Sequence, residues 1–213
     1  MRIILLSMFV LIISCQETKE KTQNISSKEV SHLPYFNTSD FTPDWKKGTH
    51  KIPAFNFLNQ NGDTINNDTY SDKIYVADFI FTTCQGICPK LTTNMNSLQE
   101  KYKEDDNIML LSHSVMPWKD TVEVLQQYAN DNNVDSEKWN ILTGDKEAIY
   151  TLAREGYFSD EEFNDTEVKG EFIHTENFLL VDKKGYIRGV YNGTLEVDIL
   201  RLIRHIEILK NEV

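Results

Sequence analysis

Two cysteines four positions apart carry the clearest chemical signal in this sequence. Cys84 and Cys88 follow an apolar, β-branched and aromatic run at residues 74–81, and Pro89 comes directly after the second cysteine. Proline is favoured in the first turn of a helix, where its missing N–H costs no hydrogen bond. The pattern therefore predicts that both thiols lie between a buried strand and a helix that runs to about residue 102.

This position determines what the two thiols could do. The N–H groups and dipole of a helix N-terminus favour a thiolate and lower a cysteine pKa from its usual value of about 8.5. A thiolate is the nucleophile of disulfide exchange and also a soft ligand for Cu(I). Redox chemistry and soft-metal binding are therefore both expected, with a pair of inert structural cysteines as the third interpretation.

The rest of the chain predicts an α/β domain that would position this pair. Asn-Gly at residues 61–62 indicates a hairpin within residues 53–65, just before the cysteine strand. We expect Asp120 to cap a helix over residues 122–128, and Asp145 to cap one that ends near Arg154. The remaining predicted elements are strands at 107–115, 139–143, 178–181 and 186–191 and a final helix at 195–209.

The Cys-x-x-x-Cys-Pro motif, after a strand ending in Phe-x-x-x-Cys, resembles the Sco/SenC family of copper-handling proteins. The resemblance implies a thioredoxin-like fold, with an N-terminal β-hairpin and a mixed central sheet between helices. It also implies a role in assembling the dinuclear copper centre of cytochrome c oxidase. In that family a histidine upstream of a strand ending in Leu-x-Asp-x-x-Gly is the third copper ligand. His174 occupies this place, with Asp182 and Gly185 in register.

The other histidines are weaker candidates. His32 and His50 lie in the segment before the domain, and His205 falls on the final helix, so His113 in the 107–115 strand is the only rival to His174. One departure from the family pattern follows His113. The family usually has Asp-Pro-x-x-Asp-Thr there, but its first aspartate is Met116 in this chain, which weakens a functional role for that loop.

The first fifteen residues predict export. A basic residue and a short apolar core end in Ile-Ser-Cys, which looks like a bacterial lipobox with Cys15 as the lipidated mature terminus. The alternative is an ordinary signal peptide cut elsewhere. We expect residues 1–14 to be a signal peptide, 15–32 a flexible tether, 33–51 an arm and 52–213 the domain. The protein would then be a membrane-anchored lipoprotein of the cell envelope facing the periplasm, where disulfides persist. The net charge of −11 disfavours nucleic acid as a partner.

Three functions remain open at this stage. The first is a metallochaperone that delivers copper to the copper-site subunit of cytochrome c oxidase, with Cys84, Cys88 and His174 as ligands for Cu(I) and Cu(II). The second is a thiol–disulfide reductase that keeps the cysteines of the oxidase copper site reduced, using Cys84 and Cys88 alone. The third, a peroxide-reducing enzyme, is the weakest, because it requires a supporting arginine near a Thr/Ser-x-x-Cys nucleophile.

Overall fold

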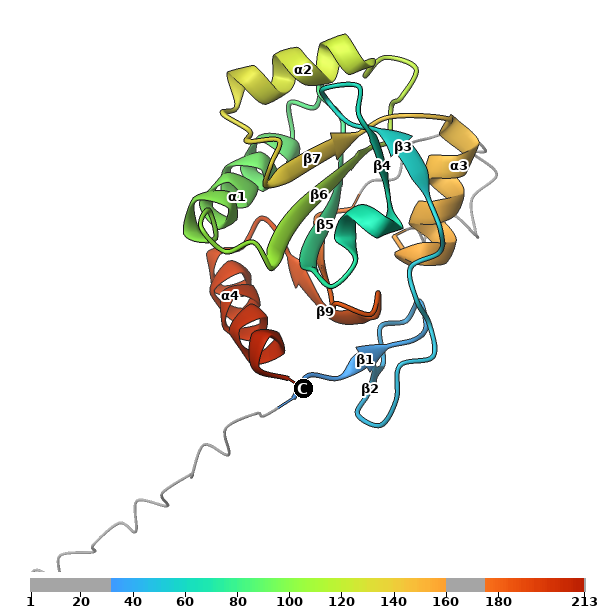
Figure 1. The fold of residues 1–213 in the computed structure, drawn as a ribbon, viewed down its shortest axis with the longest axis vertical. Coiled ribbons are helices and arrows are strands. Elements are labelled where there is room, and N and C mark those ends of the chain that lie inside the picture. Colours follow the sequence, from blue (N-terminus) through green and yellow to red (C-terminus); the bar gives the residue numbers. More distant parts are fainter. Residues whose placement is uncertain (1–31, 160–174, 213) are drawn as a thin grey trace, which may run out of the picture.

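A mixed five-stranded sheet forms the centre of the domain. The computed structural model describes residues 32–159 and 175–212, and the sheet has the order β7-β6-β5-β8-β9 (Figure 1). Strands β5, β6 and β7 are parallel, whereas β8 pairs antiparallel with β5 and with β9. The bounds are β5 Ile74–Ile80, β6 Ile108–Ser114, β7 Trp139–Leu142, β8 Asn177–Val181 and β9 Ile187–Asn192.

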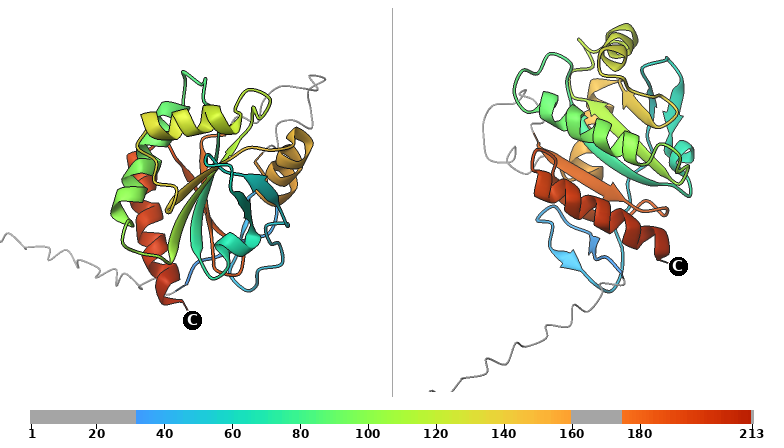
Figure 2. Two further views of the ribbon diagram at one scale, coloured as in Figure 1. Left: turned by 45° about the horizontal axis from the view of Figure 1, so that its top comes forward. Right: turned by 90° about the vertical axis from the view of Figure 1, so that its left-hand side faces the viewer.

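Helices cover both faces of this sheet, and each face has its own hydrophobic core. Because side chains alternate along a strand, β5 sends Val76 and Ile80 to one core and Tyr75 and Phe79 to the other. The first core packs against α1 (Cys88–Lys101), α2 (Val122–Asp131) and α4 (Glu196–Asn211). Helix α3 (Lys146–Thr151) and its π-helical continuation η2 (Leu152–Gly156) pack on the second. Figure 2 shows α1 and α4 lying across the first face.

Two small hairpins complete the fold. The hairpin of β3 (Asn56–Leu58) and β4 (Thr64–Asn66) turns where Asn-Gly predicts it, and Gly62 has φ +81°, a conformation that glycine adopts without a Cβ penalty. The short helix η1 (Asn67–Tyr70) then leads into β5. The preceding arm forms β1 (Tyr35–Phe36) and β2 (Pro43–Asp44), which lie beside β9 (Figure 1).

Arg188 fastens the arm to the domain. Its buried guanidinium donates to the backbone oxygens of Leu33 and Pro34 at 2.6 and 3.0 Å, and it pairs with Asp182 and Glu212 at 3.0 and 2.7 Å. Both ends of the described chain therefore meet at one side chain of β9.

The predicted fold class is confirmed, since the domain is α/β with a mixed central sheet and flanking helices. The helix predicted to end near Arg154 instead changes to π-helical geometry at Leu152 and continues to Gly156. Within residues 32–159 and 175–212, no helix is both long and apolar enough to cross a membrane.

Candidate thiol site

Cys84 and Cys88 lie together at the carboxyl end of β5. Cys88 is the first residue of α1 and Pro89 follows it, as the sequence predicts. Cys84 lies in the loop between strand and helix, where its N–H donates to the Phe81 carbonyl at 3.2 Å. Cys84 is partly exposed, whereas Cys88 is only 4% exposed and packs into the core under α1. Both are free thiols.

The two thiols have opposite acidities. Partial burial alone would raise the pKa of Cys84, but hydrogen bonds from the Cys88 side chain and from the backbone N–H groups of Cys88, Gly86 and Ile87 outweigh it and lower the pKa. Burial raises the pKa of Cys88 to about 12, with a further increase from its interaction with Cys84. The pair therefore combines a partly exposed thiol of lowered pKa with a buried thiol of raised pKa.

A buried carboxyl lies on the same side of the sheet as Cys88. Asp78, in the middle of β5, is 1% exposed, and its Oδ1 accepts a hydrogen bond of 2.5 Å from Ser112. Its Oδ2 has no hydrogen-bond partner. Burial raises the pKa of Asp78 to about 7, and the charge of Asp78 contributes to the raised pKa of Cys88. Sequence reasoning missed Asp78, although a single acidic residue in an apolar strand is a signal that could have identified it.

The expectation for Asp120 is wrong. Thr121 is the residue that caps α2, by accepting from Val124 N at 3.4 Å. Asp120 is fully buried and accepts hydrogen bonds from the Thr82 hydroxyl at 2.6 Å, the Thr82 N–H at 3.2 Å and the Ser114 hydroxyl at 2.5 Å. Asp120 therefore connects the end of β6 to the start of the cysteine loop, at a residue that lies two positions before Cys84.

The structure separates His113 from the thiols. His113 pairs in register with Phe79 and points into the second core, on the opposite face of the sheet from Cys88. Aromatic rings surround it and neither ring nitrogen has a hydrogen-bond partner, so burial lowers its pKa to about 3. A histidine enclosed in this way does not reach a metal held at residues 84 and 88.

Two of the other histidines each contact a polar group elsewhere in the domain. His205 Nδ1 lies 2.8 Å from the Tyr191 hydroxyl, and His50 Nε2 lies 2.8 Å from the Gly156 carbonyl. His174 and Cys15 lie outside the described residues. Among the residues that are described, no three His, Cys, Asp or Glu side chains group together in a way that could hold a metal ion. The described part of the site is thus a dithiol whose predicted third ligand is His174.

Residues 44–208 match the SCO1/SenC family model. A SCO1 protein homolog of Bacillus subtilis is 31% identical over 149 residues, which cover 68% of this chain and 75% of the relative. A SCO1/SenC family lipoprotein of Bacillus anthracis has a similar crystal structure, with a TM-score of 0.66 and 30% identity. This match covers 78% of this chain and 98% of the lipoprotein.

Two further solved structures are similar to this chain. BsSco is described as a member of the Sco family of cytochrome c oxidase assembly proteins with a disulfide switch. Its structure matches with a TM-score of 0.65 and 28% identity, over 77% of this chain and 96% of its own. ScoI of Arabidopsis thaliana, solved with copper bound, has a TM-score of 0.55 and 20% identity over 75% of this chain and 96% of its own, a similarity that shows the fold alone.

Proposed function

Because the chain belongs to the SCO1/SenC family, we propose that it is a copper-binding metallochaperone that assists assembly of the copper centre of cytochrome c oxidase. The observation that carries the proposal is the thiol pair itself. Cys88 is the first residue of α1 and Cys84 lies in the loop that leads into it, and interaction with the Cys88 side chain lowers the pKa of Cys84. Two thiolates in such an arrangement suit Cu(I), and an added imidazole from His174 would also serve Cu(II). Copper is the cargo in this account, and the copper-site subunit of the oxidase is the recipient.

A second function, reduction of disulfides in the same oxidase subunit, has its own support in the asymmetry of the pair. Cys84 is partly exposed and its pKa is lowered, so it is suited to attack a disulfide. Cys88 is buried with a raised pKa, so it would remain protonated until the mixed disulfide forms and then displace the product thiol. Both functions need the same two residues and can coexist.

The location of the protein is part of the proposal. Lipidation of Cys15 would hold the domain at a membrane surface of the cell envelope and leave the thiols facing the periplasm. The Ile-Ser-Cys motif supports this, and the related Bacillus anthracis protein is described as a lipoprotein. Mass spectrometry of the mature terminus tests it: an acylated Cys15 is expected, and an unmodified peptide spanning Ser14 and Cys15 would contradict it.

The experiment that separates chaperone from reductase replaces His174. We expect His174→Ala to weaken Cu(I) binding and to weaken Cu(II) binding more, because imidazole suits the harder ion better than thiolate does. Reduction of a disulfide should persist, since that attack depends on the thiolate fraction and access of Cys84. Copper affinity is measured by chelator competition, and disulfide reduction by thiol trapping.

His113→Ala is the matched control, because this buried imidazole points into the core on the other face of the sheet. It should lower stability and leave copper affinity unchanged in the folded protein. If His113→Ala loses copper while His174→Ala binds it like the parent, the ligand assignment is wrong. If neither variant changes copper affinity, the two-cysteine reductase becomes the better account.

A further inference from the structure

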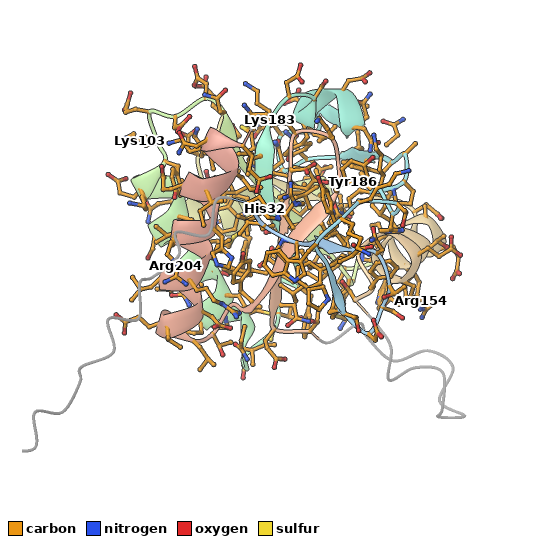
Figure 3. The ribbon with its side chains drawn as sticks, turned by 90° about the horizontal axis from the view of Figure 1, so that it is seen from below. His32, Lys103, Arg154, Lys183, Tyr186 and Arg204 are labelled. Carbon is orange, nitrogen blue, oxygen red and sulfur yellow. The ribbon has the colours of Figure 1, made fainter. Side chains whose placement is uncertain are left out.

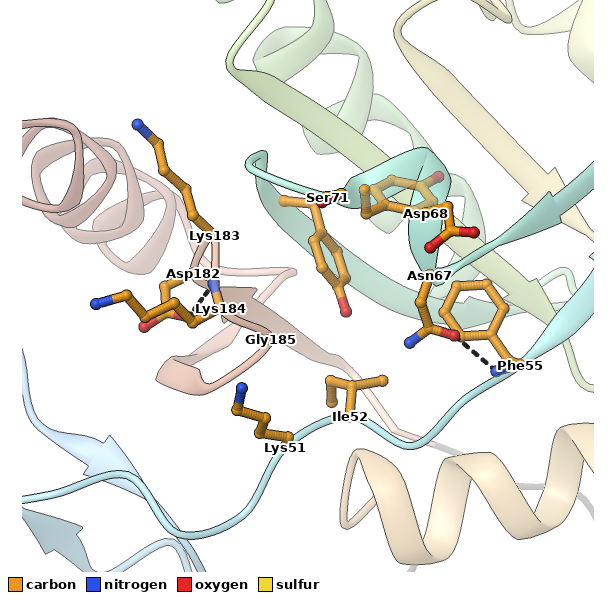
Figure 4. A pocket seen from close by; sticks show the side chains of 12 residues that line it. Lys51, Ile52, Phe55, Asn67, Asp68, Ser71, Asp182, Lys183, Lys184 and Gly185 are labelled. Atoms are coloured by element: carbon orange, nitrogen blue, oxygen red, sulfur yellow. Dashed lines mark hydrogen bonds between the residues drawn. The ribbon is translucent and has the colours of Figure 1, made fainter.

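A cavity of about 290 Å³ lies at the end of the domain opposite the thiols. Segment 51–55, helix η1 and the turn between β8 and β9 enclose it (Figure 4). Because β8 runs antiparallel to β5, the β8–β9 turn is at the end of the sheet where β5 begins, whereas the cysteine loop is where β5 ends. The cavity is therefore separated from the thiols by the length of β5.

Lysines gather at the rim of this cavity. Lys183 and Lys184 extend outward from the turn, and Lys51 extends toward that turn from the other side (Figure 4). All three are exposed, and none forms an ion pair with any residue in the described part of the chain. The ammonium group of Lys51 also lies 4.8 Å from the ring centroid of Tyr186.

The carboxylates at the cavity do not neutralise these lysines. The Oδ2 of Asp182 pairs with Arg188 at 3.0 Å, and its Oδ1 accepts from the backbone N–H groups of Lys184 and Tyr186. Asp68, which is exposed, is the other carboxylate in the lining. The cavity thus carries three lysines against one uncompensated carboxylate, on a chain whose net charge is −11. Such a local excess of positive charge attracts anions.

The walls are preformed and offer further donors. Tyr75 and Tyr70 are buried, and their hydroxyls lie 3.3 Å from the Tyr157 hydroxyl and 3.3 Å from the Leu110 carbonyl. On the exposed side, the Asn67 amide already holds the Pro53 carbonyl at 3.0 Å and retains a second N–H, and the hydroxyl of Ser71 is a further donor. The volume is at the small end of ligand sites, which favours a small anionic group.

We propose that this cavity, with Lys51, Lys183 and Lys184 at its rim, binds a phosphate-bearing anion. Phosphate offers several acceptor oxygens to the three ammonium groups, and such charge-assisted hydrogen bonds are stronger than neutral ones. The proposal is independent of the copper function, because it uses none of the thiol residues and concerns the opposite end of the sheet.

Two sources could supply this phosphate, and the position of the cavity allows both. The proposed lipid anchor, Cys15, precedes the domain in the sequence, and His32 lies with Lys183 and Tyr186 on the face seen in Figure 3. The phosphate could therefore belong to a lipid headgroup on a membrane near the start of the domain, or to a soluble phosphate compound.

Titration calorimetry of the full-length protein in a non-ionic detergent, at about 150 mM ionic strength, tests the proposal with two probes. Inorganic phosphate represents the soluble source, and glycerophosphoglycerol, which is a phospholipid headgroup without its acyl chains, represents the lipid. Both should compete for one site. Tighter binding of glycerophosphoglycerol would identify a headgroup site, and tighter binding of phosphate would identify a soluble ligand.

The variants locate the binding. Lys183→Gln combined with Lys184→Gln should weaken the preferred probe about tenfold or more, which is the loss expected for charged hydrogen bonds. The matched control is Lys46→Gln with Lys47→Gln, an exposed pair outside this cavity that removes the same charge, and it should change the affinity less than twofold. Absence of binding by both probes, or an equal loss in the two double variants, would overturn the proposal.

Discussion

Asp78 allows a stability prediction with a defined pH dependence. Its carboxyl is buried in the middle of β5, with one oxygen bonded to Ser112 and the other without a partner. Burial raises its pKa from 3.8 to about 7 in the folded protein. The folded state therefore holds a proton between pH 3.8 and 7 that the unfolded state has released, so this residue costs stability as pH rises through that range.

Asp78→Asn should remove this cost. An asparagine amide has nearly the shape of the protonated carboxyl and keeps an acceptor for Ser112. The difference of about 3 pKa units corresponds to roughly 4 kcal/mol, so the variant should be more stable by about 4 kcal/mol at pH 8 and by about 1 kcal/mol at pH 4.5. These differences in stability are measured relative to a pH below 3.8. There Asp78 is protonated in both the folded and the unfolded state, so the two proteins should be equally stable.

The assay is urea unfolding of the reduced, copper-free full-length protein and of the variant, at several pH values. The difference in unfolding free energy between the two proteins isolates residue 78, because other titrating groups contribute equally to both. A gain that does not change between pH 4.5 and 8, or a loss of stability at pH 8, would refute the assignment of Asp78 as a carboxyl destabilised by burial.

Three further substitutions have defined outcomes. His113→Leu should stabilise the protein, because burial lowers the pKa of His113 to about 3 and the unfolded state gains a proton below pH 6.5. The difference in unfolding free energy between the variant and the parent, measured in urea, should be about 2 kcal/mol larger at pH 5 than at pH 8. A difference that is the same at both pH values would contradict this. Asp120→Asn should cost about 2–4 kcal/mol, since an amide N–H would face the donors of Thr82, and Cys84 should be alkylated faster. Unchanged alkylation would show that Asp120 does not hold the loop. Arg188→Met should lower the free energy of unfolding by about 3–5 kcal/mol, because it leaves the carboxylates of Asp182 and Glu212 without their ion-pair partner. The variant should also expose the arm to limited proteolysis. An arm that remains protected would show that other contacts hold it.

Much of the fold could be predicted because its signals are local. Asn-Gly at 61–62 requires a backbone that glycine adopts readily, and the structure places a hairpin turn there. Pro89 similarly marks the first turn of α1, which fixes where the two cysteines lie relative to the helix. The local backbone preference determines the structure at each of these positions, and the tertiary packing is compatible with it.

The residues that sequence reasoning missed are defined by distant partners. Asp120 and Thr121 are both good helix caps, and only the hydrogen bonds from Thr82, 38 positions away, show why the threonine caps α2. Arg188 is an ordinary strand residue in sequence, yet its guanidinium joins Glu212 to a backbone carbonyl 155 residues away. No periodicity or motif encodes such pairings.

The central claim is that Cys84 and Cys88 hold copper as a pair of thiolates. The measurement that tests it most directly is Cu(I) affinity by chelator competition, carried out on the reduced full-length protein and on the same protein with the two cysteines oxidised to a disulfide. The account predicts tight binding of one Cu(I) by the reduced form and none by the disulfide form, because the disulfide offers no thiolate. Equal affinity of the two forms would contradict it.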